Sequence, residues 1–194
     1  MISRRSLVLG IAGALAAPSL ALAHKDEKKG GERKKFVLAP EFQPQTVDFD
    51  PAFVPGTIVV DPAKKFLYFV ESPGIARRYG VGVGKAGLAW SGTAEVARKA
   101  KWPRWTPTPN MIKRDPNRYQ KHAGGMAGGP GNPLGARALY LYRDGRDTLY
   151  RIHGTTEPWS IGRAVSSGCI RMLNEHVTEL YERVPVGAPV VVLR

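Results

Sequence analysis

Short runs of alternating or β-branched hydrophobic residues, separated by turn residues, recur along most of the chain. Residues 57–61 (TIVVD) and 64–71 (KKFLYFVE) are two such runs joined by an Asp-Pro turn, and they predict a hairpin. Residues 77–85 (RRYGVGVGK) predict a third strand, and residues 92–102 (GTAEVARKAKW) predict a fourth. This part of the chain is therefore expected to be β-sheet.

The clearest hairpin signal lies in residues 136–154 (ARALYLYRDGRDTLYRIHG). Two alternating runs flank Asp144 and Gly145, a pair that tolerates the positive φ angles of a tight hairpin turn. The second run ends at His153, and Gly154 follows it. We therefore expect His153 at the rim of the sheet and not in the middle of its core.

One helix is predicted near the C-terminus, in residues 174–184 (NEHVTELYERV). Asn174 is its expected N-cap, and Pro185 ends it. The apolar residues fall at i, i+3, i+4 and i+7 on one face: Val177, Leu180, Tyr181 and Val184. Residues 188–194 (APVVVLR) then predict a buried closing strand.

Residues 102–135 are irregular and rich in proline and glycine. Long loops inside compact domains are usually functional or disordered. Trp102 and Trp105 favour an ordered loop, which could wall a groove. Taken together, the patterns predict a mostly β domain with one or two short helices.

Residues 1–23 have the layout of a cleaved signal peptide, with a basic start, an apolar run and an Ala-Leu-Ala cleavage site. A retained N-terminal anchor is the alternative, although Pro18 interrupts a run that is short for a membrane span. Ser-Arg-Arg-Ser-Leu at residues 3–7 leaves the Sec and twin-arginine routes both open. Residues 24–56 are expected to form a basic disordered linker and an extended arm, and residues 57–194 a single domain.

The chain is strongly basic, with 29 Lys and Arg against 16 Asp and Glu and a formal net charge of +13. Removing residues 1–23 takes away Arg4 and Arg5 and leaves +11 (13 − 2). A basic exported protein is attracted to polyanions such as cell-wall polymers and anionic lipid, and the alternative is that the charge serves solubility alone. Export argues against nucleic acid as a partner.

Two motifs are rejected as cofactor sites. Residues 82–87 match G-x-G-x-x-G, but no helical pattern follows, and Ala86 stands where a phosphate-binding loop needs Ser or Thr. His153, Cys169 and His176 lack the close paired spacing of zinc ligands, so no metal is expected. His176 lies off the apolar face of the predicted helix and is expected to be solvated, as is the loop residue His122.

Cys169 is the only cysteine, so it cannot form a disulfide within the chain. In an exported protein it is a buried small hydrophobe, a bridge between two chains or a reactive thiol. The small, polar residues Ser166, Ser167 and Gly168 precede it, which favours the reactive thiol.

The residues around Cys169 could support a nucleophile. Backbone N–H groups near Gly168 and Cys169 could bind an oxyanion. Arg171 favours a thiolate and could also bind a substrate carboxylate. His153 is the candidate base, because the turn-rich segment between it and Cys169 is long enough to loop back.

These residues resemble a known family. His153-Gly154-Thr155, Gly162 and then Ser166-Ser167-Gly168-Cys169-Ile170-Arg171-Met172 are similar to the signature of the L,D-transpeptidase (YkuD) catalytic domain, usually H-G-T, a gap, and S-H-G-C-[IV]-R-[ML]. YGVGVGK, WPRWTPTPNM, GPGNPLGARALYL and LYERVPVGAPVVVL extend the resemblance over roughly residues 57–193. Ser167 departs from it, because the usual form has a second histidine there.

The resemblance implies a YkuD-like β-sandwich or barrel and acyl transfer on peptidoglycan. Cys169 would attack the carbonyl between the third residue of a tetrapeptide stem and its terminal D-Ala, releasing D-Ala and forming a thioester. His153 would be the general base and acid, oriented by the Gly154 backbone. Arg171 and the Gly168 and Cys169 amides would hold the oxyanion or a substrate carboxylate, and Ser167 would donate through its hydroxyl or be a spectator.

An amine acceptor would then resolve the thioester, either a second stem (a 3→3 cross-link), the C-terminal lysine of an outer-membrane lipoprotein, or a D-amino acid. The resemblance implies no metal or organic cofactor and a periplasmic or cell-wall location without a membrane span in the mature chain. Two alternatives remain: an L,D-carboxypeptidase or amidase in which water resolves the thioester, and a non-catalytic wall-binding module.

Overall fold

The structure of the protein is a computed structural model that describes residues 36–86 and 88–194. The predicted signal peptide and residues 24–35 of the predicted linker lie outside the described residues. Within the described part of the chain, no helix has the length and apolar character needed to cross a membrane.

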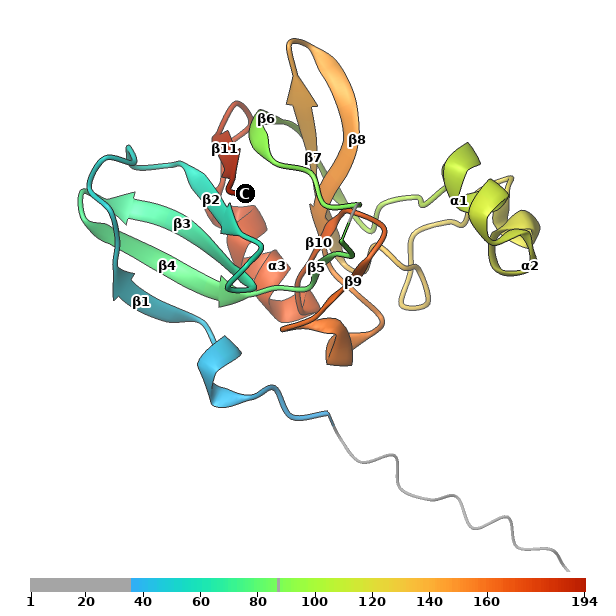
Figure 1. Cartoon of the computed structure of the whole chain (residues 1–194), viewed down its shortest axis with the longest axis horizontal. Coiled ribbons are helices and arrows are strands. Elements are labelled where there is room, and N and C mark those ends of the chain that lie inside the picture. The colour runs from blue at the N-terminus through green and yellow to red at the C-terminus, as the bar shows by residue number, and fades with distance from the viewer. Residues whose placement is uncertain (1–35, 87) are drawn as a thin grey trace, which may run out of the picture. The chain divides into compact units, whose positions relative to one another are not determined.

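Most strands join one mixed sheet of nine strands, in the order β1-β4-β3-β2-β11-β6-β7-β8-β10 (Figure 1). A second sheet pairs β5 with β9 in parallel. The strands are β1 (Gln45–Asp48), β2 (Ile58–Asp61), β3 (Phe66–Ser72), β4 (Ile75–Gly80), β5 (Val83–Gly84), β6 (Gly92–Lys101), β7 (Arg137–Arg143), β8 (Arg146–His153), β9 (Ala164–Ser166), β10 (Ile170–Arg171) and β11 (Pro189–Val192).

The helices are short. They are α1 (Pro109–Arg114), α2 (Pro116–Tyr119) and α3 (Asn174–Arg183), with 3-10 turns η1 (Pro40–Phe42), η2 (Gln120–His122) and η3 (Pro158–Ser160). The mostly β prediction is confirmed, although the described residues contain three α-helices where one or two were expected. Figure 1 shows α1 and α2 standing away from β1, on the side of the sheet where β10 lies.

Both predicted hairpins are present, because β2 pairs antiparallel with β3 and β7 with β8. Asp144 and Gly145 turn the second hairpin with φ angles of 50° and 71°, as expected for this pair. The closing strand β11 lies parallel to β2 and antiparallel to β6, in the middle of the sheet.

The prediction of one strand over residues 77–85 is wrong in detail, because the segment divides into β4 and β5. Beyond β4, the backbone of Gly82 forms an isolated antiparallel bridge with Arg171 of β10, at the other edge of the large sheet. A Cβ atom at residue 82 would lie 2.6 Å from the Ser160 carbonyl oxygen, so glycine permits the close approach. As a result, β5 runs beside the segment that carries Cys169.

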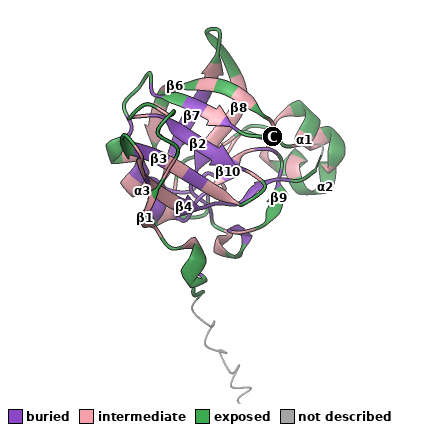
Figure 2. Cartoon of the chain, turned by 60° about the vertical axis from the view of Figure 1, so that its left-hand side comes forward, coloured by how far each residue is buried: buried purple, intermediate pink, exposed green. Residues whose placement is uncertain are grey.

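The central strands and α3 form the core, shown as buried residues in Figure 2. Three of the predicted apolar residues of α3 are buried, Val177, Leu180 and Val184, while Tyr181 is partly buried against the core. The helix packs on β7 and β8, so it supports the strand that carries His153.

Two local predictions, the N-cap of α3 and the solvation of His176, differ from the structure. Leu173 occupies the N-cap position of α3, and Asn174 is its first helical residue. His176 is buried, with its ring 6.3 Å from that of Tyr79, because the first turn of α3 lies beneath β4. Burial lowers the pKa of His176. The arm at residues 36–56 contributes β1, which joins the sheet antiparallel to β4.

Candidate active site

β8 and β10 pair in parallel, and this pairing places His153 and Cys169 on the lining of one cavity. Arg171 lies opposite His153, and Ile170 lies opposite Ile152. Side chains alternate between the two faces of a strand, so His153 and Arg171 share one face while both isoleucines are buried on the other. Cys169, two residues before Arg171, lines the same cavity as these two residues.

The cavity has a volume of about 980 Å³. Its lining includes residues of β8 and of the loop before β10, together with residues of α1, α2 and the irregular loop. Trp105 lines it, as predicted, whereas Trp102 is not among the lining residues. His122, expected to be solvated, packs edge-on against Trp105, with ring centroids 5.8 Å apart.

His153 is buried at the end of β8, and its imidazole is held in one tautomer. Its Nδ1 lies 2.5 Å from the Gly154 carbonyl oxygen. A carbonyl oxygen only accepts, so Nδ1 carries the proton and Nε2 is the basic nitrogen. Burial lowers the pKa of His153 to about 4, and the charges of Arg171 and Arg151 act in the same direction. The imidazole is therefore neutral at pH 7.

Asn174 fixes the segment that follows His153. Its Oδ1 accepts a hydrogen bond from the Ala136 N–H at 2.9 Å, and its Nδ2 donates to the Thr155 carbonyl at 3.2 Å. A Cβ atom at residue 154 would collide with Asn174 Oδ1, so the site requires glycine there. From the sequence, Asn174 was predicted only as a helix cap. Its hydrogen bonds to the segments on either side of the site could not be predicted, because both partners are distant along the chain.

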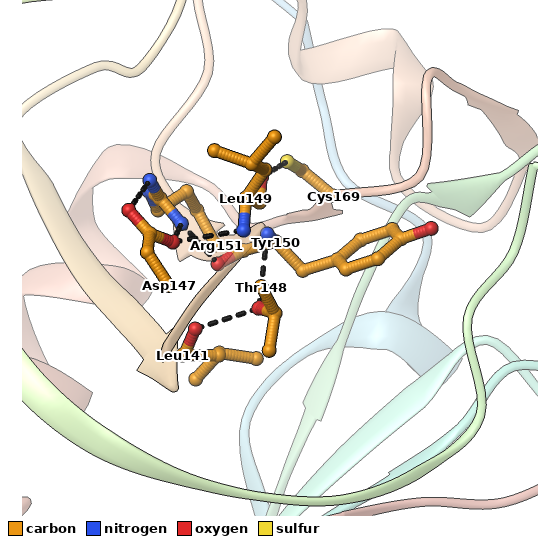
Figure 3. A network of polar contacts seen from close by, with 7 residues as sticks. All are labelled: Leu141, Asp147, Thr148, Leu149, Tyr150, Arg151 and Cys169. Carbon is orange, nitrogen blue, oxygen red and sulfur yellow. Dashed lines mark hydrogen bonds and ion pairs between the residues drawn. The ribbon is translucent and has the colours of Figure 1, made fainter. Parts of the chain in front are cut away.

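The thiol of Cys169 is half-buried, and its Sγ lies 3.9 Å from the Leu149 carbonyl oxygen (Figure 3). Burial raises the pKa of Cys169, outweighing the Arg151 N–H and the charges of Arg151 and Arg171, which lower it. The charge of Arg171 lowers the pKa of the thiol, as expected, but it does not offset the effect of burial. Cysteine and histidine are both neutral in the absence of substrate.

A β-bulge presents the Leu149 carbonyl to this thiol. Tyr140 pairs with Arg151 and Tyr142 with Asp147, so residues 148–150 face a single residue of β7. Leu149 has a φ of 64°, unusual for a residue other than glycine.

Side chains of the same strand hold the bulge in place (Figure 3). Asp147 Oδ1 accepts the Leu149 N–H at 2.8 Å, and the Arg151 guanidinium binds both carboxylate oxygens of Asp147 at 2.6 and 2.7 Å. Thr148 Oγ1 donates to the Leu141 carbonyl at 2.6 Å. Asp147 and Arg151 were not singled out from the sequence, since only the irregular pairing of β7 with β8 gives them a role.

Arg171 lines the cavity, but its charge is already paired. Its Nη1 lies 2.6 Å from Glu157 Oε2, and Arg118 Nη2 lies 3.5 Å from Glu157 Oε1. The Arg171 backbone N–H donates to the Gly82 carbonyl at 2.8 Å, which ties β10 to the segment before β5.

The loop before Cys169 has specific backbone requirements. Gly168 has a φ of 122°, and a Cβ atom there would lie 2.5 Å from Tyr150 Cε1. The Gly168 N–H donates to Ser166 Oγ at 3.1 Å, so in this state its amide is occupied. Ser167 is exposed, and its Oγ accepts a hydrogen bond from Arg114 Nη2 at 2.8 Å.

The glycine motif at residues 82–87 does not open a helix. β5 covers two of its residues, a turn follows, and β6 begins at Gly92. The dinucleotide-binding arrangement, a glycine-rich turn leading into a helix, is therefore not formed by the described residues of this segment. Across the described ranges, no three His, Cys, Asp or Glu side chains are grouped so that they could share a metal ion.

The sequence model of the YkuD family, described as an L,D-transpeptidase catalytic domain, matches residues 55–192. The chain is 37% identical over 141 residues to the probable L,D-transpeptidase ErfK/SrfK of Escherichia coli K12, covering 70% of this chain and 43% of that protein. It is 34% identical over 139 residues to the probable L,D-transpeptidase YbiS of the same strain, with the same coverage. The chain thus spans less than half the length of these relatives.

Solved structures show a similar fold. A Brucella melitensis protein described as a probable carnitine operon oxidoreductase is 55% identical, with a TM-score of 0.56 over 80% of this chain and 96% of that one. An L,D-transpeptidase from Mycobacterium smegmatis is 19% identical, with a TM-score of 0.53 over 71% of this chain and 58% of that one. The second likeness concerns the fold alone.

Proposed function

The chain belongs to the family of L,D-transpeptidase catalytic domains, and on this premise we propose that it is an exported peptidoglycan L,D-transpeptidase with Cys169 as nucleophile and His153 as general base. The observation that carries the proposal is that both side chains line one cavity, His153 from the end of β8 and Cys169 from the residue just before β10, the strand that pairs with β8. In this proposal residues 57–194 are the catalytic domain.

The first half-reaction is acylation of the thiol. As Cys169 Sγ attacks the carbonyl between the third stem residue and D-Ala, the thiol proton passes to His153 Nε2. The Gly154 carbonyl accepts from Nδ1–H and stabilises the imidazolium that forms. The imidazolium then protonates the amine of D-Ala as the C–N bond breaks, leaving a thioester on Cys169.

The oxyanion of this step needs donors close to the thiol. We assign the Cys169 amide and Arg171 to this task, with Arg171 kept in place by Glu157. The Gly168 amide would join them by exchanging Ser166 Oγ for the oxyanion.

The second half-reaction is attack by an acceptor amine on the thioester: His153 takes the amine proton, a new amide bond forms, and the proton returns to Cys169 Sγ as the C–S bond breaks. The acceptor is a second stem peptide, the lysine of an outer-membrane lipoprotein or a D-amino acid, and transfer to water would make the enzyme a carboxypeptidase. The protein would act in the periplasm or at the cell wall after cleavage of residues 1–23. Its basic surface would favour the anionic wall.

The test is to incubate the protein without residues 1–23 with a muropeptide carrying a tetrapeptide stem and to analyse the products by mass spectrometry. We expect release of D-Ala and a cross-linked dimer from the wild type, and neither from Cys169→Ala or His153→Ala. Tripeptide without dimer would indicate the hydrolase. Retention on isolated cell wall without any product would indicate the binding module and refute the proposal.

A further inference from the structure

The cavity that contains Cys169 is lined by charges of one sign. Seven arginine and lysine side chains line it, and no aspartate or glutamate does. Three of the seven pair with Asp147 or Glu157, which lie outside the lining. The other four have no carboxylate partner among the described residues, and Arg114 is one of them. A cavity with unpaired cationic side chains favours an anionic ligand.

Arg114 is the unpaired cation with a direct link to the catalytic loop. It is the last residue of α1, and its Nη2 donates to Ser167 Oγ, two residues before the nucleophile. The adjacent Asp115 forms no ion pair with Arg114 among the described residues, and its Oδ1 accepts the Arg118 N–H at the start of α2. Guanidinium has five N–H donors, so most of them remain available to a ligand.

Carboxylate is the anion that fits this arrangement. The planar guanidinium binds a carboxylate through two parallel hydrogen bonds, while an amide, which is neutral, offers one acceptor and no charge. Because Arg114 is anchored so near Cys169, the group it meets belongs to the stem residues on either side of the reacting carbonyl.

We propose that Arg114, positioned by Ser167, selects a donor stem with a free carboxylate on one of the two residues joined by the scissile bond, and discriminates against the stem amidated at that carboxylate. This inference rests on the proposed function and names the substrate class of the same site. It also gives Ser167 a role: its hydroxyl oxygen orients Arg114 and does not itself act on the substrate.

The test compares three synthetic tetrapeptide stems. One has diaminopimelate with a free side-chain carboxylate at the third position, one has the amide at that side chain, and one has the amide at the terminal D-Ala. We expect the full chain to use the free acid with a kcat/KM about tenfold higher than one of the two amides, the size of a charge-assisted hydrogen bond at an exposed site. The amide that is used poorly identifies which carboxylate Arg114 binds.

Variants assign this preference to Arg114. Arg114→Gln should use free acid and amide within about twofold of each other, by losing activity on the acid only. Arg114→Lys should keep part of the preference, and Ser167→Ala should lower it about threefold, because the guanidinium is no longer held. Lys113→Gln removes the same charge from an exposed neighbour in α1 that does not line the cavity, so it should keep the full preference.

Equal use of all three stems by the wild type would overturn the inference. An equal loss of activity on the acid and on the amide in Arg114→Gln would also overturn it. That result would mean that the hydrogen bond to Ser167 only holds α1 against the catalytic loop. Calorimetric titration of Cys169→Ala with the three stems keeps the test independent of turnover. A chain that binds the acid more tightly through Arg114 but releases no D-Ala would refute the proposed function and leave this inference standing.

Discussion

At the scale of single residues, His153 and Cys169 are adjusted to exchange a proton only when substrate is present. Burial lowers the pKa of the imidazole and raises that of the thiol, so both are neutral at pH 7. A neutral Nε2 can accept the thiol proton during attack, whereas an imidazolium cannot. The site therefore behaves as a general-base site and not as a preformed thiolate–imidazolium pair.

This state predicts the pH dependence of the reaction. Activity is lost when His153 becomes protonated, so kcat/KM should stay level as the pH falls through 6.5 and should drop only near its pKa of about 4. Measuring kcat/KM for D-Ala release between pH 3.5 and 8 checks this expectation. An acid limb near 6.5, the ordinary value for histidine, would contradict the assignment of His153 as a buried neutral base.

A second prediction at this scale concerns Gly168. A Cβ atom there would lie 2.5 Å from Tyr150 Cε1 and 2.8 Å from the Leu88 carbonyl oxygen, and the φ of 122° is unfavourable for any other residue. Gly168→Ala should therefore destabilise the protein by about 1–3 kcal/mol and reduce D-Ala release strongly. Gly129→Ala, with no atom within 4 Å of the new Cβ, is the control and should change neither. Thermal unfolding and turnover of both variants would test this, and unchanged turnover in Gly168→Ala would show that the loop tolerates the shift.

At the scale of elements, the bulge in β8 links the hairpin to the thiol. Asp147 accepts the Leu149 N–H and binds the Arg151 guanidinium, and the bulge aims the Leu149 carbonyl at Cys169. The Asp147 charge also raises the pKa of Cys169, while the Arg151 charge lowers it. The bulge thus contributes to the placement of the thiol and to its pKa, although burial remains the largest influence on that pKa.

Asp147→Asn should lower the pKa of the Cys169 thiol, because it removes a negative charge and leaves the Arg151 charge unpaired. We expect kcat for D-Ala release to fall about tenfold with a smaller change in KM, since thiol placement is impaired and substrate contacts are kept. The rate of alkylation by iodoacetamide as a function of pH reports the thiol pKa. Asp144→Asn, in the exposed turn of the same hairpin, is the matched control, and a thiol pKa that does not move in Asp147→Asn would contradict the argument.

The elements also show how far the sequence alone can lead. The hairpin of β7 and β8 was predictable because alternation and the Asp-Gly turn are local signals. The bulge at residues 148–150 was not, since it depends on the bidentate contact between Asp147 and Arg151. The division into β4 and β5 likewise depends on Ser160, a residue distant in the sequence that approaches the Gly82 backbone.

The same distinction applies to the site. The resemblance to the family signature singled out Cys169 and His153, but their shared face follows from the parallel pairing of β10 with β8, a non-local contact. Arg114 could not be found from the sequence, because its partner Ser167 follows 53 residues later in the chain, in the loop between β9 and β10. Likewise, burial of His176 depends on the packing of β4 over α3 and not on the helix's own apolar pattern.

At the scale of the whole molecule, the buried histidines couple acid titration to folding. The pKa of His153 in the folded protein is about 4, while an unfolded histidine has a pKa near 6.5, and the pKa of His176 is lowered as well. Below pH 6.5 the unfolded chain therefore binds more protons than the folded protein. Stability should fall as the pH drops from 6.5 towards 4.

For His153 alone the full effect is on the order of 3 kcal/mol, reached when the pH falls to about 4, and about 2 kcal/mol of it should be lost between pH 7 and 5. Urea unfolding at these two pH values measures the loss for the wild type and for His153→Gln, which cannot titrate. The free energy of unfolding should fall by about 2 kcal/mol less in the variant than in the wild type between these two pH values. Each protein is compared with itself at the two pH values, so the effect of the substitution on stability cancels. The carboxylate of Asp147, whose pKa is lowered, does not interfere, because its contribution is lost only as the pH falls below the ordinary carboxyl range. Equal losses in the two proteins would mean that His153 is not held neutral by burial, and the general-base argument would fail with it.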